Sequence, residues 1–401
     1  PVGDTLELYR NYRRHPSFAV YSGGNEGSFG KALDRELYRL VKSIDPDRLK
    51  ICQDTQMARF NTVGNSDFTG GPVAEWPRGS VDPDRPFVCH EYLNLCVKLD
   101  SRTEGDFTGA WMPPTTRAER AAWLGKFGLD HAWGDRLQDA QHRQQAYWQK
   151  HGVESARADP HCDGFCFWTI ADVVVKQFDA YTSQGLFDPF WRPKRGGWTP
   201  EDFAKFNSPT CVLADFGSEC RVFTSGDRIR CDFLLSHYGE RPMERARLKW
   251  KILAGERLLQ GGDLQVGDQP LGPARKIGTA EIRVPEVERP VKAVFAVEIG
   301  NAANSWDVWV FPQRTRRRVS GVAASRSLVP ALDRLYDGIV SVEEAKDCRV
   351  AILTSDDPAQ AGLLAKGVHV VALGPVNRSQ PRKCSSWMVN RRKTVFTRPR
   401  K

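Results

Sequence analysis

The feature that most constrains the fold is a change in the hydrophobic pattern near residue 207. Before it, short apolar runs alternate with helical stretches such as 31–43 and 137–158, and a Trp-rich insertion occupies 110–131. The apolar runs are at 18–21, 49–53, 67–69, 86–89 and 164–168. Strands that alternate with helices are typical of βα units on a parallel sheet. Residues 1–206 are therefore predicted to be an α/β unit.

From 207 to 313 the pattern is that of an all-β unit. Short runs of alternating apolar and polar residues, such as 228–235 and 291–299, are separated by Gly, Asp and Pro. This spacing, over roughly 100 residues, is typical of an antiparallel β-sandwich. The sequence therefore predicts a multidomain protein that joins an α/β part to an all-β part.

The remainder of the chain, 314–401, is predicted to hold a linker and a small α/β unit. Residues 314–328 are rich in Arg, Ser, Gly and Ala, which favours a linker. The unit 329–401 begins with a helix–strand–helix–strand pattern over 329–373, which predicts a parallel pair of strands. It ends in a basic tail, because residues 375–401 contain nine Lys or Arg and no Asp or Glu.

The net charge of +9 is therefore confined to the tail. Removing its nine basic residues from the total of 58 leaves 49, which equals the 49 acidic residues. A neutral body does not favour a nucleic-acid-binding protein. No apolar run approaches the roughly 20 residues that span a bilayer, so no membrane partner is predicted.

The ten cysteines show no paired CxxC pattern. Cys162 and Cys166 have CxxxC spacing, but no second pair or HxxxH accompanies them, so we predict neither a metal nor another cofactor. The chain opens with Pro1 inside an Arg-rich segment that reads as an amphipathic helix. We therefore expect residue 1 to be a truncation point, and neither localisation nor oligomeric state can be predicted.

Two short strands each deliver a glutamate at their C-terminal end. The run RHPSFAVYSGGNE ends in Glu26, and PFVCHEY contains Glu91. A third strand, in DGFCFWTIAD, delivers Trp168. The C-terminal ends of strands are where (β/α)8 barrels hold their active sites. Glycoside hydrolysis needs two carboxylates on either side of the scissile bond, so this pair of glutamates points to that chemistry.

These segments resemble glycoside hydrolase family 2. RHPSFAVYSGGNE is similar to the acid/base signature of that family, PFVCHEY to its nucleophile strand, and DGFCFWTIAD to its last barrel strand. GLFD at 185–188 with RPK at 192–194 is similar to the exit from the barrel. The resemblance covers most of 1–313. It implies strands 4–8 of a (β/α)8 (TIM) barrel over 1–206 and an immunoglobulin-like sandwich over 207–313. The unit after 329 resembles part of a glutamine-amidotransferase-like module.

The resemblance also implies roles for individual residues. Glu26 is the expected acid/base and Glu91 the expected nucleophile of a retaining exo-β-glycosidase that acts on a glycoside, an oligosaccharide or a polysaccharide. The expected substrate-binding residues are Asn25, His90, Tyr92, Trp168, Trp76 and Trp111. Asn25 would bind the sugar 2-hydroxyl, Tyr92 or His90 would tune the nucleophile, and Trp168 would form a platform under the sugar ring. Trp76 and Trp111 are weaker candidates for the same wall.

Three points stay open at the level of sequence. If Glu26 follows strand 4, barrel strands 1–3 lie outside these residues, so we expect no useful activity from the 401 residues alone. No motif selects a galactoside, glucuronide or mannoside. There are two alternative functions. The chain could belong to an endo-acting glucanase or mannanase of the same clan, or to a non-catalytic carbohydrate-binding protein.

Overall fold

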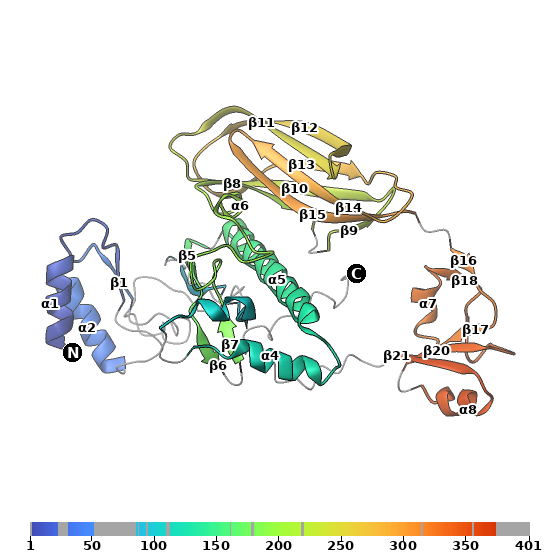
Figure 1. The fold of residues 1–401 in the computed structure, drawn as a ribbon. Coiled ribbons are helices and arrows are strands. Elements are labelled where there is room, and N and C mark those ends of the chain that lie inside the picture. The colour runs from blue at the N-terminus through green and yellow to red at the C-terminus, as the bar shows by residue number, and fades with distance from the viewer. Residues whose placement is uncertain are drawn as a thin grey trace.

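The computed structural model describes residues 2–22, 31–51, 86, 88–93, 95–109, 113–160, 162–177, 180–217, 220–313, 316–354 and 357–373. For 31, 89–91, 175–177 and 180 it describes the backbone alone. Helices and strands are mixed in the first half, and strands dominate the second (Figure 1). The coarse prediction of an α/β part followed by a β part is therefore confirmed.

The N-terminal elements form a βαβ unit. They are α1 (Val2–Tyr12), β1 (Val20–Ser22), α2 (Lys31–Ile44) and β2 (Leu49–Ile51). Strands β1 and β2 are parallel, with Val20 opposite Leu49. The buried side chains of Tyr9, Tyr21 and Val41 pack together and join the helices to β1. This is the parallel pairing that the alternation of strands and helices predicts.

A second parallel pair is formed by β3 (Val88–Tyr92) and β5 (Gly164–Phe167). Between these strands lie β4 (Val97–Lys98), the 3₁₀ helix η2 (Ser101–Asp106), α4 (Thr116–Gly125) and the long α5 (His131–Ala158). Helix α5 begins at His131 because the Asp130 carboxylate accepts a hydrogen bond from the backbone N–H of Trp133 at 3.0 Å. The predicted start at 137 is therefore six residues late. Within the described residues, no helix is both long and apolar enough to cross a membrane.

A small antiparallel sheet has the order β4-β7-β6. It pairs β4 with two strands that follow β5 in the chain, β6 (Val175–Gln177) and β7 (Ala180–Ser183). The short helix α6 (Pro200–Ala204) then leads into the β part. Thr199 caps this helix, because its hydroxyl accepts the backbone N–H of Asp202 at 3.1 Å, and Pro200 occupies the first turn.

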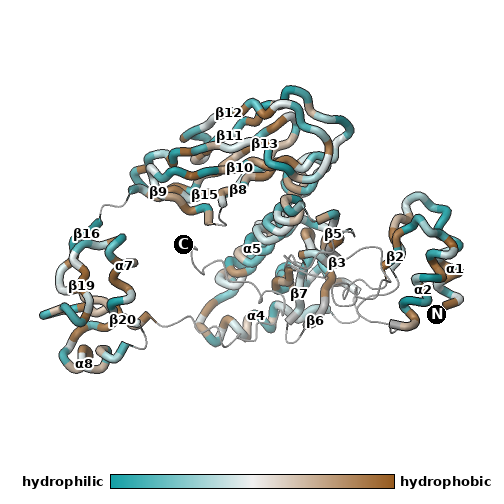
Figure 2. The backbone as a smooth tube through the Cα atoms, turned by 180° about the vertical axis from the view of Figure 1, so that it is seen from behind, coloured by the Kyte–Doolittle hydropathy of each residue, from teal (hydrophilic) through white to brown (hydrophobic). Residues whose placement is uncertain are grey.

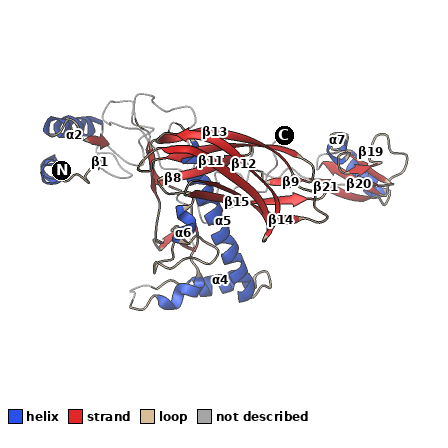
Figure 3. Cartoon of the chain, turned by 90° about the horizontal axis from the view of Figure 1, so that it is seen from above, coloured by secondary structure: helices blue, strands red, loops and turns tan. Residues whose placement is uncertain are grey.

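Residues 210–311 form two sheets packed face to face (Figure 3). One sheet consists of β8 (Thr210–Asp215), β10 (Arg228–His237) and β13 (Gly272–Arg283). The other has the order β12-β11-β14-β15-β9 and consists of β12 (Arg257–Gln269), β11 (Met243–Ala254), β14 (Val291–Ile299), β15 (Ala302–Phe311) and β9 (Val222–Thr224). All pairings are antiparallel except that of β9 with β15. The runs 228–235 and 291–299 are strands, as predicted.

The core of the sandwich follows from alternation of buried and more exposed residues along the central strands of its larger sheet. In β15 the buried positions are every second residue, and the same holds for most of β11 and β14. Phe233, Trp250, Phe295 and Trp306 meet between the sheets, and Phe295 is 1% exposed. Aromatic side chains bury more apolar surface than any others, so this cluster supplies much of the cohesion of the two sheets.

Helix α5 joins the first half of the chain to the sandwich through a buried polar cluster. The Lys150 ammonium and the Glu154 carboxylate form an ion pair at 2.8 Å on the face of α5 that meets β15. From β15, the Asn304 amide donates to Glu154 at 2.9 Å, and the Trp306 indole N–H donates to it at 3.0 Å. Lys150 also donates to the side-chain oxygen of Asn304. The contact is therefore held by charges and hydrogen bonds as well as by apolar packing.

The C-terminal elements form a four-stranded parallel sheet of order β19-β17-β20-β21, at the opposite end of the molecule from α1 and α2 (Figures 1 and 2). Its strands are β17 (Val322–Ala324), β19 (Val340–Ser341), β20 (Val350–Thr354) and β21 (His369–Leu373). Around it lie β16 (Arg317–Arg318), α7 (Val329–Leu332), β18 (Tyr336–Asp337) and α8 (Ala359–Ala365). The parallel pair β20–β21 matches the predicted pair.

The linker predicted at 314–328 differs from the structure. It contains β16 and also β17, which lies between β19 and β20 in the sheet. Three small or β-branched residues between Gly321 and Ser325 are too short a run to be recognised as a strand from sequence. The predicted basic tail lies outside the described residues.

Candidate active site

The C-terminal ends of β3 and β5 lie side by side. In this parallel pair Val88 is opposite Gly164 and Tyr92 is opposite Phe167. The backbone N–H of Trp168 donates to the carbonyl oxygen of Tyr92 at 2.8 Å, so the chain leaving β5 stays bound to the end of β3. Glu91 is the residue before Tyr92, within β3 rather than after it. The structure therefore brings the backbone of Glu91 and Trp168 to one edge.

The ring of Trp168 is fixed by a second hydrogen bond. Its side chain is half-buried, and its indole N–H donates to the side-chain oxygen of Gln184 at 3.0 Å. Gln184 itself is 4% exposed. The peptide bond from Trp168 to Thr169 is cis. Trp168 thus has both its backbone and its ring tied to neighbouring segments, whereas a solvated loop aromatic would have neither.

Tyr92 does not fit the substrate-binding role expected of it. The residue is 3% exposed, and its hydroxyl donates to the backbone carbonyl of Gly152 in α5 at 2.8 Å. Its ring packs against Phe165, with the centroids 5.4 Å apart, and it belongs to a buried cluster with Val153 and Phe206. The hydroxyl already donates its hydrogen bond to a helix carbonyl, and the ring is enclosed. Tyr92 therefore packs β3 against α5.

The other predicted site residues are not tested by the structure. Asn25, Glu26, Trp76 and Trp111 lie outside the described residues. His90 and Glu91 are described by their backbone in β3 and not by their side chains. The separation of the two carboxylates and the contacts of Asn25 and His90 with a sugar therefore stay predictions.

A buried ion pair joins Asp172, four residues after Trp168, to Lys194, and no sequence motif predicts it. The Lys194 ammonium is 2.7 Å from the Asp172 carboxylate, and their side chains are 3% and 2% exposed. Lys194 also donates to the Ser183 hydroxyl at 2.8 Å and to the carbonyl oxygen of Gly185 at 2.6 Å. Burial lowers the pKa of Lys194, and the adjacent carboxylate acts against this shift. Lys194 belongs to the RPK motif, which suggested a barrel exit but not a partner.

The same ion pair holds two loop segments together. Asp172 accepts hydrogen bonds from the Ser183 hydroxyl and from the backbone N–H of Gly185, both at 2.6 Å. Gly185 has no room for a side chain, because an added Cβ would lie 2.5 Å from backbone atoms of Ala171 and Asp172. The segment after Trp168 and the segment after Gln184 are therefore in backbone contact.

His142 on α5 is held neutral beside this network. Gln138 donates its amide N–H to His142 Nε2 at 2.9 Å and to the carbonyl oxygen of Lys98 at 2.8 Å. The opposite ring nitrogen, Nδ1, lies 3.1 Å from the carbonyl oxygen of Arg195, to which it donates. Burial, together with the nearby charge of Lys194, lowers the pKa of His142 below its ordinary value of 6.5. Protonation of His142 would place its Nε2–H donor against the amide N–H donor of Gln138.

We expect this neutral histidine to make the fold acid-sensitive. Since the folded state binds the proton more weakly than the unfolded state, the free energy of unfolding falls as the pH drops from 6.5 through the lower folded-state pKa. Urea unfolding measured from about pH 7 to about pH 5 should therefore depend less on pH in His142→Gln than in the parent. His131, exposed at the start of α5, gives the control His131→Gln, which should match the parent. Equal pH dependence in parent and His142→Gln would contradict the assignment.

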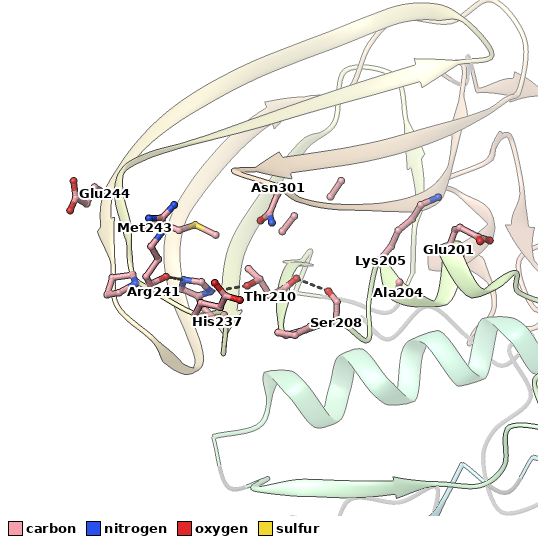
Figure 4. A pocket seen from close by; sticks show the side chains of 16 residues that line it. Glu201, Ala204, Lys205, Ser208, Thr210, His237, Arg241, Met243, Glu244 and Asn301 are labelled. Atoms are coloured by element: carbon pink, nitrogen blue, oxygen red, sulfur yellow. Dashed lines mark hydrogen bonds between the residues drawn. The ribbon is translucent and has the colours of Figure 1, made fainter.

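An open cavity of about 970 Å³ lies elsewhere, where α6 meets one end of the sandwich (Figure 4). Glu201 and Lys205 line it from one side, and Arg241 and Glu244 from the other. His237 at its floor is bound on both nitrogens, by the Thr210 hydroxyl at 2.8 Å and the carbonyl oxygen of Arg241 at 3.0 Å. Of the predicted site residues whose side chains the structure describes, neither Tyr92 nor Trp168 lines this cavity. Among the described residues, no three His, Cys, Asp or Glu side chains gather as a metal site.

One family model matches part of the chain, at residues 227–312, and it is described as a domain of unknown function (DUF8488). The match covers β10 to β15 of the sandwich, which is less than half of the chain. No curated protein matches.

Several solved structures are similar to the chain at low scores. A β-glucuronidase of Bacteroides uniformis has 12% identity and a TM-score of 0.33, over 82% of this chain and 38% of that one. The exo-chitosanase CsxA of Amycolatopsis orientalis has 13% identity and a TM-score of 0.44, over 76% of this chain and 38% of that one. The chain thus spans less than half the length of these glycoside hydrolases, and a likeness this low carries no argument about its function.

Proposed function

We propose that this chain supplies the catalytic carboxylates of a retaining β-glycosidase of the family 2 type. Glu26 is the acid/base and Glu91 the nucleophile. The observation that supports the proposal most is the parallel pair β3–β5, in which the Trp168 N–H binds the carbonyl oxygen of the residue that follows Glu91. A nucleophile and a sugar platform have to lie at the same edge of a barrel, and a pairing that brings the backbones of Glu91 and Trp168 near each other supports this arrangement.

The proposed mechanism is a double displacement. Glu91 attacks the anomeric carbon while Glu26 gives its proton to the leaving oxygen, and a covalent glycosyl–enzyme intermediate forms. Glu26, now ionised, takes a proton from water, which attacks the anomeric carbon and releases Glu91. The sugar leaves with its original configuration. This mechanism places the two carboxylates about 5–5.5 Å apart.

The proposed architecture is a barrel followed by a sandwich. The pairs β1–β2 and β3–β5 are each parallel and each enclose helices, as two sections of one (β/α)8 barrel would. The residues that would join them, 52–85, lie outside the described part of the chain. Residues 207–313 are proposed to be an immunoglobulin-like domain, which is consistent with two packed sheets of three and five strands. Residues 329–373 are proposed to form a separate α/β unit together with β17, which precedes them at Val322–Ala324.

The covalent intermediate gives the sharpest test of the proposed function. A protein that contains residues 1–401 within a complete barrel is incubated with activated 2-deoxy-2-fluoro-β-glycosides of different sugars. Trapping should add one glycosyl group to the peptide that contains Glu91, and turnover of the natural glycoside should yield the β-anomer first. Inverted product, or a label on another residue, would contradict the proposal. Sugar binding without label or turnover would instead favour a non-catalytic carbohydrate-binding protein.

A further inference from the structure

The side chain that holds the Trp168 ring belongs to a segment that is itself fixed on both sides. Gln184 accepts the indole N–H at 3.0 Å, and it also hydrogen-bonds the side chain of Cys96. Both residues are buried, with Gln184 4% and Cys96 2% exposed. An amide whose oxygen faces the indole turns its NH₂ group toward the sulfur, so only one orientation satisfies both neighbours.

The residues on either side of Gln184 are tied to the buried ion pair. Before it, the Ser183 hydroxyl donates to Asp172 at 2.6 Å and accepts from Lys194 at 2.8 Å. After it, the backbone N–H of Gly185 donates to Asp172 at 2.6 Å, and its carbonyl oxygen accepts from Lys194 at 2.6 Å. The backbone at Gln184 has therefore no freedom to shift unless this ion pair rearranges.

The chain closes a loop between the ring and the ion pair. Asp172 lies four residues after Trp168, and the two segments meet again through the N–H of Leu186, which donates to the carbonyl oxygen of Thr169 at 3.1 Å. Burying an ion pair costs desolvation energy that a pair of apolar residues would avoid. A buried pair is thus better suited to fixing a geometry than to adding stability.

We propose that Gln184 is a positioning residue that sets the plane of the Trp168 ring, and that the Asp172–Lys194 pair holds Gln184 in place. The inference rests on the proposed function only in taking the ring as a sugar platform. The indole could otherwise rotate about its Cβ–Cγ bond, and the hydrogen bond to Gln184 selects one orientation. Sugar recognition then depends on residues that touch no sugar.

The test follows the indole N–H of Trp168 by ¹⁵N NMR. Trp168→Phe removes one of the 12 tryptophan side-chain signals and so assigns it. Gln184→Met keeps the size of the side chain but accepts no hydrogen bond. Loss of one hydrogen bond of about 1.4 kcal/mol should speed solvent exchange of this N–H about tenfold and move its proton signal upfield. Gln184→Glu keeps an acceptor and should preserve the slow exchange.

Two further variants separate positioning from a general loss of packing. Gln149→Met replaces a glutamine that is 2% exposed on α5 and has no hydrogen bond to Trp168, so the Trp168 signal should stay unchanged. Ser183→Ala removes a link between Gln184 and the ion pair and should speed the exchange by less than Gln184→Met does. Unchanged exchange in Gln184→Met, or equal changes in Gln149→Met, would overturn the inference.

A titration with monosaccharides on the same samples keeps this inference distinct from the proposed function. If Trp168 is a platform, a sugar should shift its indole signal in the parent and shift it less in Gln184→Met. If exchange responds to Gln184→Met but no sugar shifts the signal, the positioning inference stands and the sugar platform is wrong. If sugars shift the signal equally in both proteins, Gln184 does not control recognition.

Discussion

Replacing Glu91 by alanine is expected to lower kcat/KM on aryl β-glycosides by roughly 10⁴- to 10⁶-fold, the scale on which loss of a nucleophile acts. Under the proposed mechanism the variant has no group to form the glycosyl intermediate, while substrate contacts elsewhere remain. Added azide should attack the anomeric carbon in place of Glu91 and give a glycosyl azide of inverted configuration. The measurement is hydrolysis by a protein that contains this chain within a complete barrel, with and without azide.

Glu26→Ala should behave differently, and that difference assigns the two roles. A substrate with a good leaving group needs little protonation, so Glu26→Ala should slow nitrophenyl glycosides far less than alkyl glycosides. Glu201→Ala changes a glutamate on α6, at the cavity of Figure 4, and should leave hydrolysis unchanged. If Glu26→Ala and Glu91→Ala respond identically to the leaving group and neither responds to azide, the assignment is wrong.

The strands that carry the candidate site could be predicted because their apolar runs are short and well bounded. The predicted run 164–168 ends one residue after the observed strand β5 (Gly164–Phe167). Its parallel pairing with β3 agrees with the presence of helices between the two strands. The position of β3 was predicted less well, since the structure continues this strand through Glu91 to Tyr92. A polar pair such as His90-Glu91 breaks the apolar pattern without breaking the strand.

The start of α5 and its contacts could not be predicted from hydrophobicity. The buried face of this helix carries Gln138, His142, Gln145 and Gln149, spaced at three or four residues. Such a stripe normally marks a solvated face. Here the side chains reach backbone acceptors on other segments, for example from Gln145 to the carbonyl oxygen of Leu95 at 2.6 Å. The pattern of a helix was present, but its polarity concealed which face is buried.

Strand β12 is hard to predict from sequence for a local reason that involves one aromatic side chain. Its sequence contains Gly261-Gly262 and Asp263, which read as a turn. In the sheet, Gly262 is opposite Trp250 of β11, and an added Cβ would lie 2.8 Å from the indole ring. The glycine is therefore needed for the space that the neighbouring strand occupies. Contacts between strands determine this choice, and a single sequence does not display them.

The polar residues around Trp168 could not be predicted from the sequence for a related reason. Asp172, Gln184 and Lys194 are each ordinary surface residue types, and no spacing rule joins them. They come together because the segments after Trp168 and after Gln184 are paired through their backbones. The sequence therefore pointed to Trp168 as a candidate and not to the residues that hold its ring.

The second large effect is expected at the contact of α5 with the sandwich. Glu154→Ala should lower the free energy of unfolding by about 3–5 kcal/mol, because it leaves Lys150 buried without a counter-charge. Burial already lowers the pKa of Lys150, and Glu154 opposes that shift. The variant also leaves the Trp306 indole N–H without its acceptor. Urea unfolding followed by fluorescence and by circular dichroism measures the change.

A second ion pair of the same length provides the matched control. Lys251 and Glu298 are also 2.8 Å apart, but their side chains are 43% and 50% exposed. Solvent screens such a pair, so Glu298→Ala should cost less than about 1 kcal/mol. The double variant Lys150→Met/Glu154→Leu removes both buried charges and should be more stable than Glu154→Ala, because no uncompensated ammonium remains. Equal losses in Glu154→Ala and Glu298→Ala would show that the charges of α5 do not hold the sandwich in place.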